Sequence, residues 1–189
     1  MKGTWSKSRR SGSMNGETIS KVMAGILDRF KKIHTFIFDV DGVFTDGSLL
    51  LTEQGELLRK MSTKDGLALK KMVRSEYQAI IITGGDSAGV KKRFESMGVQ
   101  HYFSSTHDKI GRYESLLKEG IVKNNEGCLY LGDDLPDLPV IQRVGLGCCP
   151  QDAIPEVKRV ADYISPFKGG EGCVRDLIEK VLKLHGRWP

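Results

Sequence analysis

Short apolar segments alternate with helical segments along most of this chain, and this alternation constrains the fold more than any other feature. The apolar segments have the length and composition of buried strands: Thr35–Phe38, Ala79–Ile82, His101–Phe103, Cys128–Leu131, Gly145–Cys148 and Asp162–Ile164. Helical periodicity follows most of them, over Leu67–Ser75, Ala88–Met97, Ile110–Glu119, Leu138–Val144, Ile154–Val160 and Val174–Leu184. Strands that alternate with helices predict an α/β fold in which helices cover both faces of a parallel sheet.

One segment interrupts the alternation. Ser48–Leu51 and Glu56–Met61 flank the turn-like sequence Thr52–Gly55, which predicts a β-hairpin. Because leucines are consecutive in both strands, apolar side chains lie on both faces of the hairpin. A hairpin that projects from a small domain cannot bury both faces alone, so we expect a neighbouring subunit to cover one of them.

The N-terminal segment differs from the remainder in charge. We predict that residues 1–16 form a flexible basic extension and that residues 17–189 form a single domain, which begins with an amphipathic helix over Ile19–Phe30. Residues 1–32 carry a net charge of +6, whereas the rest of the chain carries −1. Because the folded body has no basic excess, we expect no nucleic-acid partner.

The composition indicates a cytoplasmic protein with no membrane span. No apolar run approaches the roughly 20 residues needed to cross a bilayer. Met1–Met14 is polar and lacks the apolar core of a secretory signal. The four cysteines show neither C-x-x-C spacing nor a nearby histidine pair, which favours reduced thiols over zinc ligands.

Two acidic residues follow the first predicted strand. Asp39 and Asp41 lie in the sequence Phe38-Asp39-Val40-Asp41-Gly42, at the carboxyl end of the strand, where open α/β sheets bind ligands. Alternate residues point to the same side, so the two carboxylates face one site. They repel each other unless a proton or cation lies between them, which predicts a divalent metal. In isolation, this motif would be more typical of a polar turn.

Three further strand ends carry groups that suit phosphate and a metal. Thr83 and Gly84 supply a hydroxyl and a flexible backbone amide after the second strand. Lys109 begins a helix after the third strand, where an ammonium and a helix amino terminus both attract an anion. Gly132–Asp137 follows the fourth strand with three carboxylates for a hard cation.

These motifs resemble the haloacid dehalogenase superfamily of phosphatases, and more closely its capless 3-deoxy-D-manno-octulosonate 8-phosphate phosphatase family. The resemblance covers residues 34–184 and rests on four segments: Asp39–Gly47, Lys64–Gly66, Gly132–Asp134 and Lys168–Gly172. It implies a Rossmann-like domain without a cap, and a homotetramer in which the hairpin forms the subunit contact. No insert in this chain is long enough for a cap, which favours hydrolysis over phosphoryl transfer within a mutase.

The resemblance also implies a mechanism. Asp39 would attack phosphorus and form an aspartyl-phosphate intermediate. Asp41 would protonate the leaving oxygen and then take a proton from water. Mg²⁺ would be held by Asp39, the backbone carbonyl of Asp41 and Asp133.

The remaining motif residues have supporting roles in the family. Thr83, Gly84 and Lys109 would bind the phosphoryl oxygens. Asp134 and Asp137 would orient metal waters and Lys109.

The implied substrate is a phosphorylated sugar acid, with 3-deoxy-D-manno-octulosonate 8-phosphate of lipopolysaccharide biosynthesis as the first candidate. Lys64 would meet the sugar-acid carboxylate, and Gly169 and Gly170 of the glycine-rich tail would approach the ligand closely. Gly85 departs from the arginine usual in these phosphatases, so a nonulosonate 9-phosphate remains an alternative. Asp65 and Asp86 are expected to cap the helices that follow them.

Two other protein classes remain as alternatives. A phospho-accepting receiver domain also places acidic residues, threonine and lysine on a parallel sheet, but there the acidic residues precede the other two. In this chain Asp133 and Asp134 follow Thr83 and Lys109, which disfavours that class. A non-catalytic phosphosugar-binding assembly subunit would require a misplaced group, because no motif residue is missing.

Overall fold

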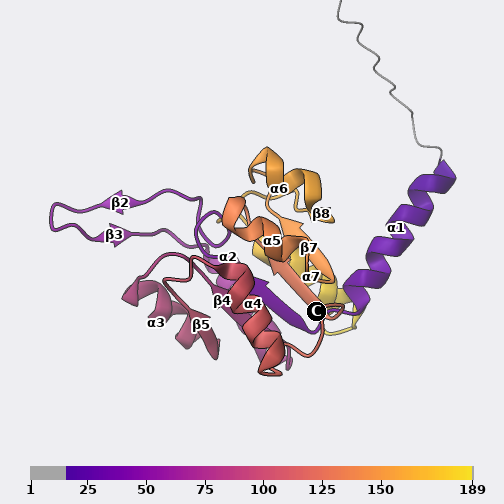
Figure 1. The fold of residues 1–189 in the computed structure, drawn as a ribbon, viewed down its shortest axis with the longest axis horizontal. Coiled ribbons are helices and arrows are strands. Elements are labelled where there is room, and N and C mark those ends of the chain that lie inside the picture. Colours follow the sequence, from indigo (N-terminus) through magenta and orange to yellow (C-terminus); the bar gives the residue numbers. More distant parts are fainter. Residues whose placement is uncertain (1–15, 189) are drawn as a thin grey trace, which may run out of the picture.

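The computed structural model describes residues 16–188, which form a six-stranded sheet with helices on both faces and a separate two-stranded hairpin (Figure 1). The six strands are parallel and lie in the order β5-β4-β1-β6-β7-β8. Their bounds are β1 Thr35–Phe38, β4 Gln78–Ile82, β5 His101–Phe103, β6 Cys128–Leu131, β7 Leu146–Cys149 and β8 Tyr163–Ile164. The predicted α/β fold is confirmed, with β7 beginning one residue later than expected.

The helices begin at serine caps in two places where the sequence predicted acidic ones. Their bounds are α1 Gly16–Lys31, α2 Thr63–Arg74, α3 Ala88–Ser96, α4 Lys109–Lys118, the 3₁₀ helix η1 Leu135–Asp137, α5 Leu138–Ile141, α6 Pro155–Val160 and α7 Cys173–Leu184. Ser62 accepts from the backbone N of Asp65 at 3.3 Å, and Ser87 accepts from that of Val90 at 3.4 Å. The predicted caps Asp65 and Asp86 were therefore wrong, because serine and aspartate serve equally well at this position.

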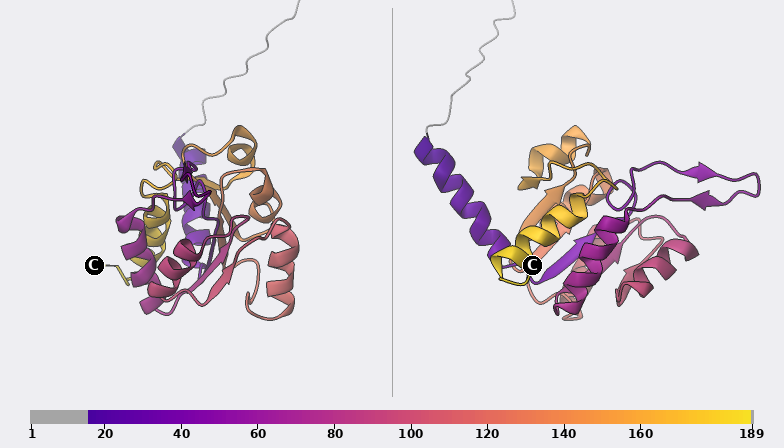
Figure 2. Two further views of the ribbon diagram at one scale, coloured as in Figure 1. Left: turned by 90° about the vertical axis from the view of Figure 1, so that its left-hand side faces the viewer. Right: turned by 180° about the vertical axis from the view of Figure 1, so that it is seen from behind.

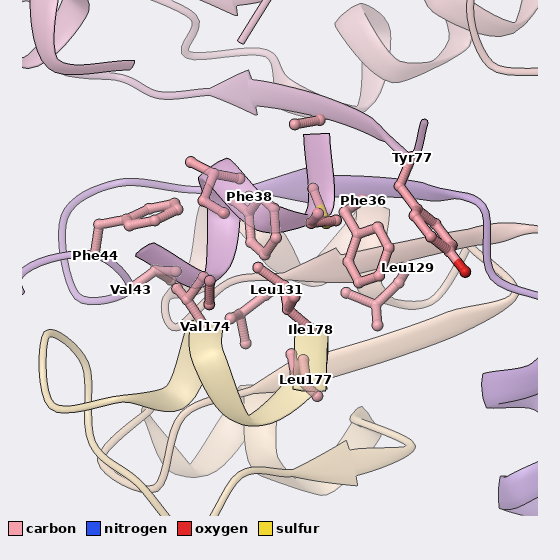
Figure 3. Packing of buried hydrophobic residues seen from close by; sticks show 14 of the residues in the cluster. Phe36, Phe38, Val43, Phe44, Tyr77, Leu129, Leu131, Val174, Leu177 and Ile178 are labelled. Carbon is pink, nitrogen blue, oxygen red and sulfur yellow. The ribbon is translucent and has the colours of Figure 1, made fainter. Parts of the chain in front are cut away.

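Alternate residues of the central strand β1 face opposite helical layers. Phe36 and Phe38 pack with Leu177 of α7 on one face, as Figure 3 shows, and all three side chains are fully buried. Ile37 points to the other face, where it packs in a cluster that includes Tyr113 of α4. Figure 2 shows α2 and α7 side by side on the first face. Burial on both faces explains the continuous apolar runs of the sequence.

The three central strands end together at one edge of the sheet. Phe38 at the end of β1 is paired with Ile81 of β4 and with Leu131 of β6. The residues that follow these strands therefore emerge next to one another, although they are far apart in the sequence.

The predicted hairpin is present and projects from the body of the domain (Figure 1). Its paired residues are β2 Leu50–Leu51 and β3 Leu57–Leu58, fewer than the sequence predicted. Leu50 and Leu51 are each 68% exposed, and both leucines of β3 are nearly half exposed. The apolar surface expected from the leucine runs is thus open in the single chain.

Helix α1 contacts the domain through Ile26 and its last turn, and the rest of the helix extends away from the domain (Figure 1). Phe30 is buried, while Arg29 donates to the carbonyl of Gly145 at 2.7 Å and pairs with Asp162 at 2.6 Å. Of the predicted basic extension, residues 1–15 lie outside the described residues. Among residues 16–188, no helix combines the length and apolar character needed to span a bilayer.

Candidate active site

An open pocket of about 370 Å³ lies at the carboxyl edge of the sheet. Its lining includes most of the site residues predicted from sequence: Asp39, Asp41, Thr83, Gly84, Lys109, Asp133, Asp134 and Asp137. A pocket of about 440 Å³ lies at the opposite, amino end of β1 and β4, and Glu76 is the single carboxylate in its lining. The chemical groups thus gather at the carboxyl edge, as the strand register requires.

Lys109 connects two buried carboxylates at the floor of the pocket. Its Nζ lies 2.9 Å from Oδ2 of Asp39 and 2.6 Å from Oδ1 of Asp137. Burial acts to lower the pKa of Lys109, but attraction to both carboxylates overcomes this effect and raises it. The predicted lysine is therefore a fixed ammonium beside the proposed nucleophile.

Asp137 organises the turn after β6. Its Oδ1 also accepts from the Tyr130 hydroxyl at 2.5 Å, and its Oδ2 accepts from the backbone N of Asp133 at 3.0 Å and of Asp134 at 3.2 Å. The side chain is fully buried. Tyr130 was not predicted as part of the site, because within β6 it looks like any buried strand residue.

Three carboxylates lie close enough to share a cation. Single oxygens of Asp39, Asp133 and Asp137 lie within 4.8 Å of one another. Burial and repulsion from Asp137 raise the pKa of Asp39 to about 7, against the attraction of Lys109. Burial and the charges of Asp137, Asp39 and Asp134 raise the pKa of Asp133 to about 8. This all-oxygen cluster, short of positive charge, fits a hard divalent cation.

Two of the three carboxylates are better placed than the third to bind the cation. Both oxygens of Asp137 already accept hydrogen bonds from protein groups. That leaves Asp39 and Asp133, the two carboxylates that the sequence predicted as metal ligands, and they lie together in the cluster. Gly42 makes room for Asp133, since a Cβ at Gly42 would lie 2.0 Å from Oδ2 of that residue. Gly42 also has φ +77°, which favours glycine.

Thr83 and Gly84 lie where the sequence placed them. Thr83 directly follows β4 and is 3% exposed, and its Oγ1 accepts from the backbone N of Gly85 at 3.2 Å. Gly84 also lines the pocket, next to His107. A buried hydroxyl and neighbouring amides are groups that bind phosphate oxygens.

Asp41 lies in the same pocket but pairs with a residue that sequence reasoning missed. Arg59, immediately after β3 of the hairpin, donates from Nε to Oδ1 of Asp41 at 2.7 Å and from Nη2 to Oδ2 at 3.0 Å. The Arg59 side chain is 5% exposed. No local motif marks this arginine, because it reaches the site only through the path of the hairpin.

Three predicted site residues, Lys64, Gly169 and Gly170, lie outside the lining of the pocket, and Asp134 lies at its exposed side. Lys64 is exposed in the first turn of α2, and its role stays a prediction. Gly169 and Gly170 pack against the loop that follows Asp39: a Cβ at Gly169 would lie 2.0 Å from the carbonyl O of Gly42. Asp134 is exposed and caps η1 by accepting from the backbone N of Leu135 at 2.7 Å.

Comparisons with known proteins identify the family of this chain. A family model described as haloacid dehalogenase-like hydrolase matches residues 103–175. The 3-deoxy-D-manno-octulosonate 8-phosphate phosphatase KdsC of Escherichia coli K12 is 31% identical over 178 residues, which cover 94% of each chain.

Two solved structures are also similar over most of their length. A subfamily III A hydrolase of the HAD superfamily from Legionella pneumophila has a TM-score of 0.87 and 37% identity, covering 91% of this chain and 94% of the other. The 3-deoxy-D-manno-octulosonate 8-phosphate phosphatase of Moraxella catarrhalis, solved with magnesium, phosphate and KDO, has a TM-score of 0.82 and 33% identity, covering 86% and 92%. The chain therefore belongs to the 3-deoxy-D-manno-octulosonate 8-phosphate phosphatase family of haloacid dehalogenase-like hydrolases.

Proposed function

We propose that this protein hydrolyses 3-deoxy-D-manno-octulosonate 8-phosphate to 3-deoxy-D-manno-octulosonate and phosphate, with Mg²⁺ as cofactor. The observation that carries the proposal is the meeting of Asp39, Lys109 and Asp133 at one sheet edge, with Asp41 in the same pocket. The KDO, phosphate and magnesium bound to the Moraxella relative support the substrate and the metal. Such a reaction fits lipopolysaccharide biosynthesis.

Asp39 is the nucleophile in this proposal. Its carboxylate attacks phosphorus, the bond from phosphorus to the sugar oxygen breaks, and an aspartyl phosphate forms on Asp39. Lys109 holds one oxygen of Asp39 at 2.9 Å, which leaves the other oxygen for attack. Lys109 and Thr83 then bind nonbridging phosphoryl oxygens, so that the charge of the transition state meets groups that are already fixed.

Asp41 transfers the protons. In the first step it gives a proton to the leaving sugar oxygen and becomes a carboxylate. In the second step it takes a proton from the water that attacks the aspartyl phosphate, which restores the acid and releases phosphate. A phosphoryl-transfer enzyme needs this acid two residues after its nucleophile, and Asp41 lies in the pocket with Asp39.

The metal would be held by Asp39, Asp133 and the backbone carbonyl of Asp41. Bound there, Mg²⁺ would supply positive charge that neutralises the phosphoryl group and allows its approach to a carboxylate. Asp137 keeps the backbone of Asp133 in place through its hydrogen bond to the amide.

We further propose that the protein acts as a cytoplasmic homotetramer. The exposed leucines of the hairpin support a contact between subunits. The four cysteines are buried free thiols, which is typical of a reducing compartment.

Phosphate release from a panel of phosphorylated sugar acids tests the function. The panel includes octulosonate 8-phosphate and nonulosonate 9-phosphate, each measured with Mg²⁺ and with a chelator. We expect metal-dependent turnover that favours the octulosonate and is abolished by Asp39→Asn. Faster turnover of nonulosonate 9-phosphate would contradict the proposed substrate. Activity that survives Asp39→Asn would exclude Asp39 as the nucleophile.

A further inference from the structure

The hairpin delivers a buried cation to the acid–base residue of the site. Arg59 lies 18 residues after Asp41 in the chain, yet its guanidinium contacts both carboxylate oxygens, at 2.7 and 3.0 Å. The hydrogen bond from its Nη1 to the carbonyl of Leu57, at 3.1 Å, ties the guanidinium back to strand β3. Only 5% of the Arg59 side chain is exposed. Arg59 does not line the pocket itself, but it lies against Asp41 and Gly85, which do.

A two-point contact fixes more than charge. Nε and Nη2 of a guanidinium are coplanar and spaced to match the two oxygens of a carboxylate, so this contact fixes both the place and the plane of the Asp41 carboxylate. Asp41 is about one third exposed and lies on a loop. Without a partner, its side chain would be free to choose among rotamers.

Gly85 provides the space that Arg59 occupies. A Cβ on Gly85 would lie 2.9 Å from Nη2 of Arg59 and 3.2 Å from Oδ2 of Asp41. Gly85 is not among the glycines with positive φ, so its backbone does not demand glycine. Glycine is favoured at this position because a larger residue would press against the guanidinium of Arg59. The site therefore has no side chain at position 85, yet a cation, that of Arg59, lies beside it.

We propose that Arg59 is the positioning residue for Asp41, and that Gly85 is its matched partner. Resting on the proposed function, this assigns Arg59 the task of fixing the position of the Asp41 side chain. Held there, the protonated carboxyl group gives its proton to the leaving oxygen, and the resulting carboxylate later takes a proton from water. Arg59 itself forms no bond to the reacting atoms.

The test uses the dependence of rate on the leaving group. A sugar alkoxide leaves only with the help of an acid, whereas p-nitrophenolate leaves without one, so loss of acid positioning lowers kcat/KM for the first kind of ester alone. We expect Arg59→Ala to lower kcat/KM for the sugar-acid phosphate by at least about 10-fold, part of the about 10²–10⁴-fold that a general acid supplies. For p-nitrophenyl phosphate we expect little change.

Two further variants separate position from charge. Arg59→Lys keeps the charge but loses the two-point contact, and Gly85→Ala keeps Arg59 but pushes against its guanidinium, so both should show the same pattern in weaker form. In Arg59→Ala/Gly85→Ala the second change should add little, because Arg59 is the nearer of the two groups that a Cβ at Gly85 would meet. Lys60→Ala is the matched control: Lys60 is the next residue, its side chain is 87% exposed, and we expect wild-type kinetics.

Several outcomes would overturn the assignment. An equal loss with both esters would mean that Arg59 supports the fold or the phosphate, and a thermal unfolding scan of each variant distinguishes these two. A rise in KM confined to substrates with a carboxylate would make Arg59 a substrate ligand. If the losses of kcat/KM from Arg59→Ala and Gly85→Ala added up in the double variant, Gly85 would act independently of Arg59. A wild-type protein that hydrolyses neither ester would remove the proposed function itself, together with this role.

Discussion

Asp137→Asn replaces a fully buried carboxylate by an amide of nearly the same shape, so its effect isolates charge from packing. The carboxylate accepts from four donors: Lys109 at 2.6 Å, the Tyr130 hydroxyl at 2.5 Å and the backbone amides of Asp133 and Asp134. An asparagine has one acceptor oxygen, so in either orientation its NH₂ group faces donors. The variant therefore loses hydrogen bonds on one side and leaves Lys109 with a single carboxylate partner.

The expected loss of stability follows from the geometry of Lys109. Removing one partner of a buried ion pair costs about 3–5 kcal/mol. Because Asp39 still lies 2.9 Å from the ammonium, we expect the lower part of that range, about 3 kcal/mol, in the free energy of unfolding. For a chain of about this size the loss corresponds to a fall in Tm of about 6–12 °C.

Activity should fall as well, because Lys109 and the backbone of Asp133 lose their fixed positions. We expect kcat to decrease by about 100-fold, which is typical of losing one preorganised electrostatic contact. Thermal unfolding and phosphate release measure the two effects on one preparation.

The matched control is Asp134→Asn. Asp134 is exposed on the same turn, and asparagine caps a helix as well as aspartate does. We therefore expect the free energy of unfolding to change by less than about 0.5 kcal/mol. If Asp137→Asn matched this control in Tm and kcat, the buried carboxylate would not be what holds Lys109 in place.

Metal-free protein should lose thermal stability as pH rises from 5 through about 8. In the folded chain the pKa of Asp39 is raised from 3.8 to about 7 and that of Asp133 from 3.8 to about 8. Over this pH range the folded chain therefore keeps protons that the unfolded chain has already lost, and stability falls as these protons are removed. Mg²⁺ should raise Tm more at pH 8 than at pH 6, because at pH 6 it must displace protons from Asp39 and Asp133. An increase in Tm that is the same at both pH values would contradict this. Leu50→Arg places a charge on the exposed hairpin and should give smaller species by light scattering than the wild type, with unchanged Tm in dilute solution. An unaltered assembly would remove the hairpin from the contact.

The sheet and most of the site could be predicted because both follow from local chain geometry. Burial on both faces makes β1 and β6 largely apolar, and parallel pairing in register brings their ends to one edge. Polar residues that follow these strands closely then come near one another. Asp39 directly follows β1, Thr83 directly follows β4, and Asp133 is the second residue after β6. All three line the pocket.

What the sequence could not supply depends on partners chosen in three dimensions. Serine and aspartate are equivalent helix caps, so the choice of Ser62 over Asp65 became clear only from the structure, where Asp65 is buried and accepts from the backbone N of Arg175 at 2.8 Å. Tyr130 belongs to the site through its hydroxyl alone, while its ring is ordinary core.

Arg59 and Gly85 show why one position cannot be interpreted by itself. Gly85 has no side chain, so the sequence alone suggests that nothing at this position contacts the site. In the structure, the volume beside Gly85 is occupied by a guanidinium from the hairpin, 26 residues earlier in the chain. The cation beside Asp41 thus comes from the end of the hairpin and not from the residues that follow β4. The hairpin therefore contacts the site through Arg59 as well as presenting an apolar surface, so a change in its tilt would move Arg59 relative to Asp41.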